Sequence, residues 1–462
     1  MDLRDPVHNF IHLTDEERKL LDTPPLQRLR GIRQLAMANL VYPGALHTRF
    51  DHTLGVTHVA GLMAKQLRLE DENIRLLRFA ALLHDVGHGP FSHVSEAALE
   101  LYAQQKAVST GTKREKIHEL VTKQIILDHK DIKDLVGAET CNNIIKLLND
   151  GYGEPFLKSL ISGPLDADKQ DYLLRDSRFC GVQYGVFDIH QLHRSLLLYG
   201  PKDERQLMIN ADGVHALEQY VMAKYYMTTN VYRHRVRLIT DQMIVRAIML
   251  GVEHDKTSKL QTLFRFDDSK DFVDNYLRWD DALFLVKFCL GAPKTACGKM
   301  LESLRTRRLH KRVFTAKVSE FAETAREQIT MLPDPDQKIV RGLIEKEVAR
   351  ILSAKKKFRQ EAGPETLIVH SFKIKSVRES SRNDEAGMMV AKTPSPVPFE
   401  QESTLFRSIN EKMDEAYCDV YAPVEWESPT ERKQVISGVR EEVLNCINGI
   451  CKNTDTKKGA AK

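Results

Sequence analysis

The chain has 462 residues, of which 42% are hydrophobic and 29% are charged, and this content suffices for one large core with a smaller lobe. The formal net charge of +4 does not indicate a nucleic-acid-binding protein, and seven scattered cysteines without a C-x-x-C pair indicate neither a disulfide framework nor a structural zinc site. Because no stretch approaches the roughly 20 apolar residues that cross a bilayer, and the N-terminus lacks the order of a signal peptide, we expect a cytoplasmic protein without a membrane partner.

Apolar residues recur with helical spacing through most of the chain up to about residue 360. A candidate capping box lies at Thr14 and Glu17, and helical spacing continues in residues 54–67, 74–83, 118–127, 216–232 and 238–250. Segment 74–83 is apolar around most of its circumference, which predicts a helix in the core. The glycines and the proline within residues 87–90 end it, because proline disfavours helical geometry before it and glycine permits a tight turn.

The composition changes after residue 360. Residues 366–375 and 418–424 alternate as strands do, residues 405–413 have helical spacing, and residues 376–403 are polar and proline-rich. The predicted fold class is therefore mainly α, a helical bundle core with a small C-terminal α+β lobe. We place the core at residues 1–330 and the C-terminal lobe at residues 331–450, with a flexible loop at 376–403 and a disordered tail at 451–462.

Four residues have side chains that suit a metal centre. The adjacent pair His84 and Asp85 follows the predicted core helix, His52 lies earlier and Asp168 much later. Two imidazoles and two carboxylates can hold a divalent ion and leave positions open for water, whose pKa the ion lowers. Each histidine alone is more simply explained as a hydrogen-bonded core residue, but the set of four predicts a hydrolytic metal site.

Further polar residues cluster around these four in the sequence. His88, His93 and His118 could donate hydrogen bonds or a proton to a leaving oxygen, although each alone could equally serve a surface or a helix cap. Arg49 lies three residues before His52 and shares its helical face. Its guanidinium suits phosphate oxygens, and the alternative is a salt bridge to a carboxylate of the metal site.

Residues 166–177 predict a helix with one polar face. Asp168, Tyr172 and Asp176 repeat at i, i+4 and i+8, and Lys169 lies beside them. A metal carboxylate, an ammonium, an aromatic ring and a second carboxylate suit a nucleotide, with lysine for phosphate, tyrosine for the sugar or base, and aspartate for a hydroxyl. A solvated amphipathic helix is the alternative.

The motifs that hold these residues resemble those of the HD-domain deoxynucleoside triphosphate triphosphohydrolases, whose name comes from the His-Asp pair. They lie at residues 5–8, 20–30, 33–35, 42–56, 82–93, 166–176 and 232–235, in matching order and near-matching spacing. The resemblance is closest to the branch typified by the SAM-and-HD-domain protein, and we expect no SAM domain before the HD region.

The resemblance implies an activity and a set of site residues. Members cleave dNTPs to a deoxynucleoside and inorganic tripolyphosphate. The metal ligands would be His52, His84, Asp85 and Asp168, holding one or two divalent ions such as Mn, Fe, Mg or Zn. Phosphate-binding and acid/base residues would be Arg49, His88, His93 and His118, with His118 as the proton donor to the leaving 5′-oxygen. The substrate pocket would contain Gln34, Leu35, Lys169, Tyr172, Asp176, Lys224 and Tyr232. Close relatives carry arginine in place of Lys224 and histidine in place of Thr228, which weakens the prediction of sugar and base preference.

The resemblance also implies regulation and assembly. Asp22, Gln27 and Arg30 match positions that read a guanine nucleotide, although they also suit the start and packing of a helix. We expect a homo-oligomer, a dimer or tetramer, that GTP or a dNTP activates. The basic runs within residues 305–312 and 355–359 are typical of solvated faces, with binding of an activating nucleotide or a nucleic-acid backbone as the alternative.

Two other functions stay open at this stage. One is another HD phosphohydrolase activity, such as a nucleotide phosphatase, a cyclic-nucleotide phosphodiesterase or an alarmone hydrolase. Gln34, Leu35, Tyr172 and Asp176 favour a deoxynucleotide over these substrates. The other is a non-catalytic sensor of nucleotides or nucleic acid, whose signature would be lost metal ligands, yet all four are present.

Overall fold

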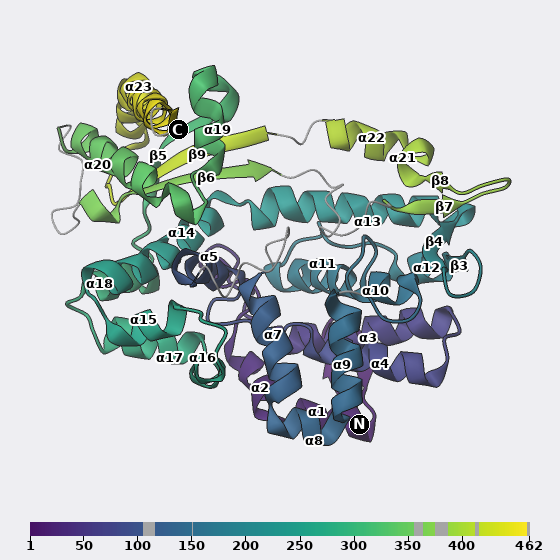
Figure 1. The fold of residues 1–462 in the computed structure, drawn as a ribbon. Coiled ribbons are helices and arrows are strands. Elements are labelled where there is room, and N and C mark those ends of the chain that lie inside the picture. Colours follow the sequence, from purple (N-terminus) through teal and green to yellow (C-terminus); the bar gives the residue numbers. More distant parts are fainter. Residues whose placement is uncertain (105–115, 150, 355–363, 375–386, 412–414, 460–462) are drawn as a thin grey trace. The chain divides into compact units, whose positions relative to one another are not determined.

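The computed structural model describes residues 1–104, 116–149, 151–354, 364–374, 387–411 and 415–459. The chain forms two compact units, each assembled from separate segments. The first comprises Met1–Arg237, Thr262–Leu285 and Val377–Glu411, and the second comprises Leu238–Gln261, Val286–Ser376 and Lys412–Lys462. Helices predominate in both (Figure 1), which confirms the predicted mainly α class. No described helix is long and apolar enough to cross a membrane.

The first unit is a helical core. Its helices are α1 (Asp15–Leu21), α2 (Pro24–Arg28), α3 (Arg49–Gln66), α4 (Asp71–Leu83), α5 (His93–Tyr102), α7 (Ile117–Asp128), α8 (Lys130–Val136), α9 (Ala138–Asn149), α10 (Pro155–Ile161), α11 (Ala167–Cys180), α12 (Ile189–Arg194), α13 (Val214–Tyr226), α16 (Lys270–Tyr276), α17 (Asp281–Leu285), α21 (Phe399–Glu402) and α22 (Thr404–Glu411). Helices α14 (Arg235–Met249) and α15 (Ser258–Phe264) cross the unit boundaries along the chain. Helices α4 and α11 both pack against α3, so these three form the centre of the unit.

Two small sheets complete the first unit. Strands β1 (Asp2–Asp5) and β2 (Asn9–His12) form an antiparallel hairpin at the N-terminus. A second sheet has the order β3-β4-β7-β8, where β3 is Leu196–Tyr199, β4 is Gln206–Asn210, β7 is Met389–Ala391 and β8 is Val397–Pro398. Because β4 pairs with β7, a late segment of the chain joins the first unit (Figure 1).

The second unit contains the predicted α+β elements. An antiparallel sheet has the order β5-β9-β6, with β5 at Lys311–Lys317, β9 at Glu415–Ala422 and β6 at Ile368–Ile374. Its remaining helices are α18 (Ala296–Arg305), α19 (Glu323–Met331), α20 (Lys338–Ala354) and α23 (Pro429–Gly459). Buried side chains of α20, β9 and α23, including Ile344, Val420 and Val443, share one apolar core.

The structure differs from the predicted course of the chain in two segments. The predicted loop 376–403 contains β7, β8 and α21, because Val390 is fully buried and β7 pairs with β4, while residues 375–386 lie outside the described part. The predicted tail 451–462 continues α23 as far as Gly459, and residues 460–462 are not described. The basic run within residues 305–312 leads into β5, and the exposure of Arg305, Arg307, Arg308 and Lys311 agrees with a solvated face. The other run, 355–359, lies outside the described residues. The division of the chain into a core at residues 1–330 and a C-terminal lobe at residues 331–450 stays a prediction.

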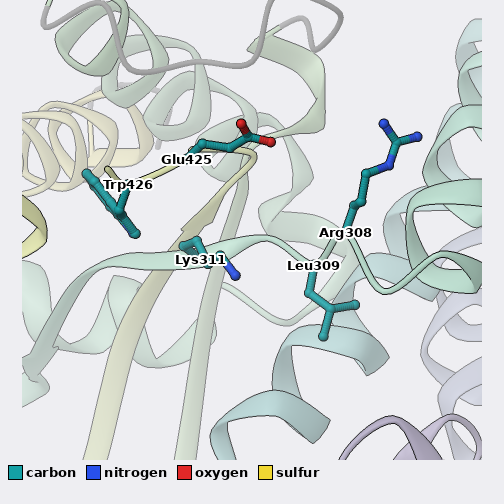
Figure 2. Close-up of a pocket in the computed structure, with 5 residues that line it drawn as sticks. All are labelled: Arg308, Leu309, Lys311, Glu425 and Trp426. Atoms are coloured by element: carbon teal, nitrogen blue, oxygen red, sulfur yellow. The ribbon is translucent and has the colours of Figure 1, made fainter. Parts of the chain in front are cut away.

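The second unit also contains a cavity of about 440 Å³ (Figure 2). Its lining residues are Arg308, Leu309, Lys311, Glu425 and Trp426. Arg308 and Lys311 are basic residues of the run within 305–312, and binding of an activating nucleotide was one interpretation of that run. None of the residues predicted for the metal centre or the substrate pocket lines this cavity.

Candidate metal centre

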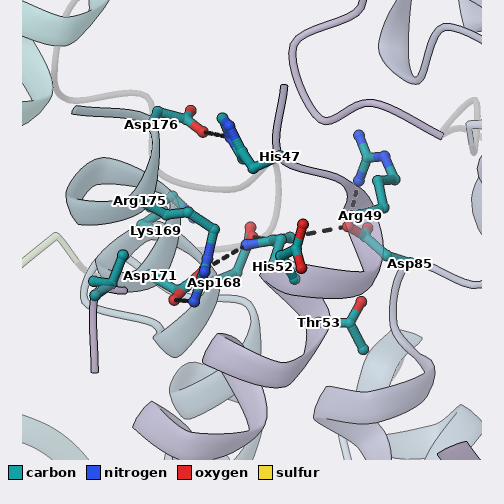
Figure 3. A network of polar contacts seen from close by, with 12 residues as sticks. His47, Arg49, His52, Thr53, Asp85, Asp168, Lys169, Asp171, Arg175 and Asp176 are labelled. Atoms are coloured by element: carbon teal, nitrogen blue, oxygen red, sulfur yellow. Dashed lines mark hydrogen bonds and ion pairs between the residues drawn. The ribbon is translucent and has the colours of Figure 1, made fainter. Parts of the chain in front are cut away.

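Three helices of the first unit bring the four predicted metal ligands together, and Figure 3 shows three of them, His52, Asp85 and Asp168. His52 lies on α3, His84 caps the C-terminus of α4 and is followed by Asp85, and Asp168 lies in the first turn of α11. His52 Nε2 lies 2.9 Å from Asp168 Oδ1 and 3.7 Å from Asp85 Oδ2. His84 Nε2 lies 3.4 Å from Asp85 Oδ2 and 3.9 Å from Asp168 Oδ1. One donor atom each from His52, His84 and Asp85 lies within 4.8 Å of the others, so this group could hold a metal ion.

Hydrogen bonds orient both imidazoles for a cation. His84 Nδ1 donates to the carbonyl of Ala81 at 2.7 Å, and its buried Nε2 has no hydrogen-bond partner. His52 Nδ1 donates to Asp171 Oδ2 at 2.8 Å, and its Nε2 donates to Asp168 Oδ1 at 2.9 Å, so that a cation bound there would replace the proton on Nε2. Histidines that bind metals are usually held in this way by their second nitrogen. The donor set therefore fits a divalent ion.

The electrostatics of the cluster favour charged carboxylates. Burial alone would lower the pKa of His52, yet its hydrogen bonds to Asp168 and Asp171 raise that pKa to about 10. Burial would raise the pKa of Asp168, but the hydrogen bond and charge of His52 lower it to about 2. Burial also opposes ionisation of Asp85, which the Arg49 charge and the neighbouring imidazoles overcome, so that its pKa lies well below the usual range. The proton that His52 holds and the guanidinium of Arg49 balance the negative charge of Asp168 and Asp85.

Arg49 makes the salt bridge that was the alternative interpretation of this residue. Its Nη1 forms an ion pair with Asp85, and its Nε donates to Ser92 Oγ at 2.8 Å. The side chain is fully buried, and helix α3 begins here with a capping box between Thr48 and Asp51. The guanidinium thus lies at the metal ligands, where contact with a phosphate stays a prediction.

The turn after α4 is built by close packing. A Cβ on Gly87 would lie 2.3 Å from the carbonyl oxygen of His118, and one on Gly89 would lie 2.1 Å from the hydroxyl of Tyr276. The left-handed conformation falls instead on Phe91 and Ser92, with φ of 63° and 60°. The helix ends before these residues as predicted, and the two glycines are required for the approach of neighbouring elements rather than for a positive φ.

Three histidines lie together next to the metal centre. The rings of His88 and His118 stack with centroids 3.9 Å apart, and the ring of His93 lies 4.7 Å from that of His88. Glu96 accepts from His118 Nδ1 at 3.0 Å and from the amide of Ile117 at 2.6 Å, at the start of α7. Burial and the Arg49 charge lower the pKa of His88 well below its usual range, so this imidazole is neutral at pH 7. The trio offers imidazole donors beside the ligands.

The polar face predicted for residues 166–177 forms on α11, although parts of it are buried. Asp176 accepts from His47 Nε2 and from the Tyr232 hydroxyl, both at 2.7 Å, and the Tyr172 and Tyr232 rings have centroids 6.0 Å apart. Burial raises the pKa of both phenols well above the ordinary value, so they stay neutral donors. Lys169 contacts Asp166, the N-cap of the helix, at 2.5 Å.

Helix α13 reaches this region through a turn of π-helix at Met227–Tyr232, which changes the direction of Tyr232 relative to a regular helix. Lys224 and Thr228 are half-buried. Gln34 and Leu35 are buried, and Gln34 Oε1 has no hydrogen-bond partner. Their contact with a sugar stays a prediction.

The predicted regulatory residues have structural contacts of their own. Gln27 Nε2 donates to the carbonyl of Leu21 at 2.9 Å, and Arg30 Nε donates to Gln27 Oε1 at 2.9 Å. The Arg30 guanidinium also lies 3.6 Å from the centre of the Phe50 ring. Asp22 ends helix α1 and is exposed. These contacts agree with the packing role that was the alternative to nucleotide binding.

Sequence reasoning missed several residues that support the site. They are His8, His47, Ser92, Glu96, Asp171, Arg175 and Asp281. Asp171 and Arg175 are four residues apart on α11 and pair there, so their spacing was a usable signal. Asp281 accepts from the amide of Phe91 at 2.7 Å and from that of Arg33 at 3.1 Å, a contact between distant segments that no local pattern reveals.

Comparison with known proteins defines the class. Residues 49–176 match the HD domain family, and residues 187–435 match the HD associated region, which alone covers more than half of the chain. The chain therefore belongs to the family of HD-domain proteins with this associated region. The expected relationship to the HD-domain deoxynucleoside triphosphate triphosphohydrolases is confirmed by relatives of about 25% identity.

Individual relatives show the extent of the likeness. The chain is 26% identical over 361 residues to the human deoxynucleoside triphosphate triphosphohydrolase SAMHD1, covering 72% of this chain and 58% of the relative. It is 33% identical over 269 residues to an uncharacterized protein of Methanocaldococcus jannaschii, covering 58% and 53%. The chain thus spans about half to two thirds of the length of the curated relatives it matches.

A solved phosphohydrolase from Bacteroides thetaiotaomicron has the same fold, with a TM-score of 0.68 and 22% identity over 91% of this chain and 99% of that one. The HD domain and the His52, His84 and Asp85 group together support a hydrolase that uses a divalent metal.

Proposed function

We propose that the protein hydrolyses deoxynucleoside triphosphates to a deoxynucleoside and inorganic tripolyphosphate. The observation that carries this proposal is the composition of one helix. Asp168 lies among the metal-binding donors, and one and two turns further along α11 are Tyr172 and Asp176, the latter held by Tyr232 and His47. A carboxylate fixed between a phenol and an imidazole, beside an aromatic ring, suits the hydroxyl and ring of a sugar. The name of the human relative describes the same reaction.

The residues present divide the work of the reaction. His52, His84, Asp85 and Asp168 would hold one or two divalent ions, and a bound ion would lower the pKa of water and neutralise phosphate charge. Water attacks the α-phosphorus, and the bond from that phosphorus to the 5′-oxygen breaks. His118, oriented by Glu96 through Nδ1, donates the proton that the 5′-oxygen takes up. Arg49, His88 and His93 stabilise the charge on the phosphate oxygens.

A second set of side chains contacts the triphosphate and the deoxyribose of the substrate. Lys169 and Lys224 bind the triphosphate as point charges. Gln34 and Leu35 lie against the deoxyribose, and Tyr172, Asp176 and Tyr232 complete the sugar pocket. Regulation by GTP or a dNTP through Asp22, Gln27 and Arg30, in a homo-oligomer, extends the proposal.

Product identity tests this function. Purified protein is incubated with dNTPs, NTPs and cyclic nucleotides plus Mn²⁺ or Mg²⁺, and the products are separated by chromatography. We expect a free deoxynucleoside with tripolyphosphate from dNTPs. Monophosphate or diphosphate products would instead indicate a different HD phosphohydrolase and overturn the proposal.

Asp168→Ala provides the control for the metal centre. Since Asp168 supplies both a predicted ligand and the partner of His52, the variant should lose at least about 1000-fold in turnover. Its thermal unfolding should stay cooperative, because the residue lies at the first turn of a helix whose N-cap is Asp166. Full activity in a metal-containing preparation would contradict the assignment of Asp168.

A further inference from the structure

The N-terminal hairpin reaches the interior of the first unit through two polar side chains. His8 Nε2 lies 2.6 Å from Asp171 Oδ1, and Asp5 Oδ2 accepts from Arg175 Nη1 at 2.8 Å. The His8 side chain is 6% exposed, and those of Asp171 and Arg175 are fully buried. The segment between β1 and β2 therefore takes part in a buried charge network on α11.

Asp171 is the centre of this network and is saturated with donors. Its Oδ1 accepts from His8 Nε2 and from Arg175 Nη2 at 3.0 Å, and its Oδ2 accepts from His52 Nδ1 at 2.8 Å and from Arg175 Nε at 2.9 Å. A carboxylate offers about four acceptor sites, so all are used. The Asp171 carboxylate cannot rotate without losing two hydrogen bonds. The donors on its two oxygens therefore fix its orientation.

This saturation determines the hydrogen positions on two histidines. Because an ionised carboxylate only accepts, His8 carries a hydrogen on Nε2 and His52 carries one on Nδ1. A cation that replaces the proton between His52 Nε2 and Asp168 then meets the lone pair of that nitrogen, whose basicity the negative partner raises. Helix α3 admits the network because position 55 is glycine, where a Cβ would lie 1.8 Å from Asp171 Oδ1.

The rest of the hairpin behaves differently. His12 and Asp2 form a pair at 2.8 Å on the paired strands, with side chains 74% and 64% exposed. A hairpin of two four-residue strands has little stability of its own, so anchoring alone could explain buried contacts. A contact that only anchors the hairpin need not be made to Asp171. His8 nevertheless donates to the fourth acceptor site of Asp171, the carboxylate that orients His52.

We propose that His8 is a positioning residue for metal binding, acting on His52 through Asp171 while Asp5 holds Arg175. The N-terminal hairpin thereby forms part of the metal centre without contacting the ion. This inference rests on the metal site of the proposed function, but it does not depend on which nucleotide is the substrate.

Two near-isosteric variants separate positioning from anchoring. The amide nitrogen of Gln reaches as far as His Nε2, whereas that of Asn is one carbon shorter. Binding of Mn²⁺ to metal-free protein is measured by electron paramagnetic resonance of the free ion, and cooperative thermal unfolding checks that each variant is folded. We expect His8→Asn to weaken Mn²⁺ affinity about 10-fold, the lower end for partners of metal ligands, and His8→Gln to stay within about 3-fold of the parent.

His12→Asn is the matched control on the same hairpin and should leave Mn²⁺ affinity unchanged. Equal Mn²⁺ affinity for the Asn and Gln variants of His8 would overturn the proposal, as would an equal loss in His12→Asn. A parent protein that binds no Mn²⁺ would overturn both this inference and the metal site. A parent that binds Mn²⁺ and responds as expected, but does not cleave dNTPs, would overturn only the proposed function. If His8→Asn does not fold, Asp171→Asn, which keeps the side-chain shape, should show the same weakening.

Discussion

The two imidazoles of the metal centre are held by different parts of the molecule. His52 is oriented by a charged side-chain network that includes Asp171 and Arg175, whereas His84 is oriented by the backbone carbonyl of Ala81 within its own helix. The network draws on segments more than 100 residues apart, and the carbonyl lies three residues away. The first arrangement is therefore open to disruption by distant substitutions, while the second depends on the turn that follows α4.

The largest effect is expected where α3 approaches the network. Gly55→Ala would place a methyl group against Asp171 Oδ1 and the Arg175 guanidinium, both buried and immobile. We expect the unfolding free energy to fall by about 3 kcal/mol, and Mn²⁺ affinity to fall about 10-fold in the folded protein. Chemical denaturation and metal binding measure the two quantities.

Gly61→Ala on the same helix is the matched control. Its Cβ would meet the terminal Nη1 of Arg78 at 2.4 Å, and moving that atom gives up one hydrogen bond, 3.2 Å long, to the carbonyl of Thr57, while Glu17 holds the rest of the guanidinium. The better helix propensity of alanine, about 1 kcal/mol, offsets part of the cost. Equal destabilisation by the two substitutions would show that the network around Asp171 is not specially constrained.

The turn after His84 can be tested through Asp281. Burial raises the pKa of this carboxyl to about 6, above the ordinary value of 3.8. Since the folded protein then binds the proton more tightly than the unfolded chain, this group stabilises the fold at low pH and loses that contribution as the pH rises through 6. The loss amounts to about 1 kcal/mol between pH 5 and pH 8.

Asp281→Asn removes this titration. The excess stability of the parent over the variant should therefore be about 1 kcal/mol greater at pH 5 than at pH 8, as measured by denaturant unfolding at both values. A pH-independent difference would show that Asp281 does not titrate in this range. Mn²⁺ affinity should change little, because Asp281 contacts Phe91 and Arg33 and not the ligands themselves.

The same contrast explains what could be predicted from sequence. The end of α4 and the face of α11 follow from local spacing. The positions of His84 and Asp85 at the end of α4, and of Asp168 and Tyr172 on α11, were therefore predictable. The network that orients His52 was not, because Asp171 lies 119 residues from His52 and 163 residues from His8, and the three meet only in the folded chain. Strands of four residues, such as β1 and β2, are too short for an alternation pattern to identify.

The smallest effect is expected at Arg30, at the start of the region that leads to α3. Its guanidinium covers the ring of Phe50, two residues before His52, and the residue is exposed. Arg30→Ala should lower the unfolding free energy by less than about 1 kcal/mol and leave Mn²⁺ affinity unchanged. Arg75→Ala removes a similar contact with the Phe79 ring at 4.7 Å, together with an ion pair to Glu16, and is the control. If Arg30 reads an activating nucleotide, its variant alone should lose stimulation of dNTP hydrolysis by GTP while basal turnover persists. If GTP still stimulates Arg30→Ala, the role of Arg30 is limited to packing. The influence of distant residues on His52 would then come only from the buried network around Asp171.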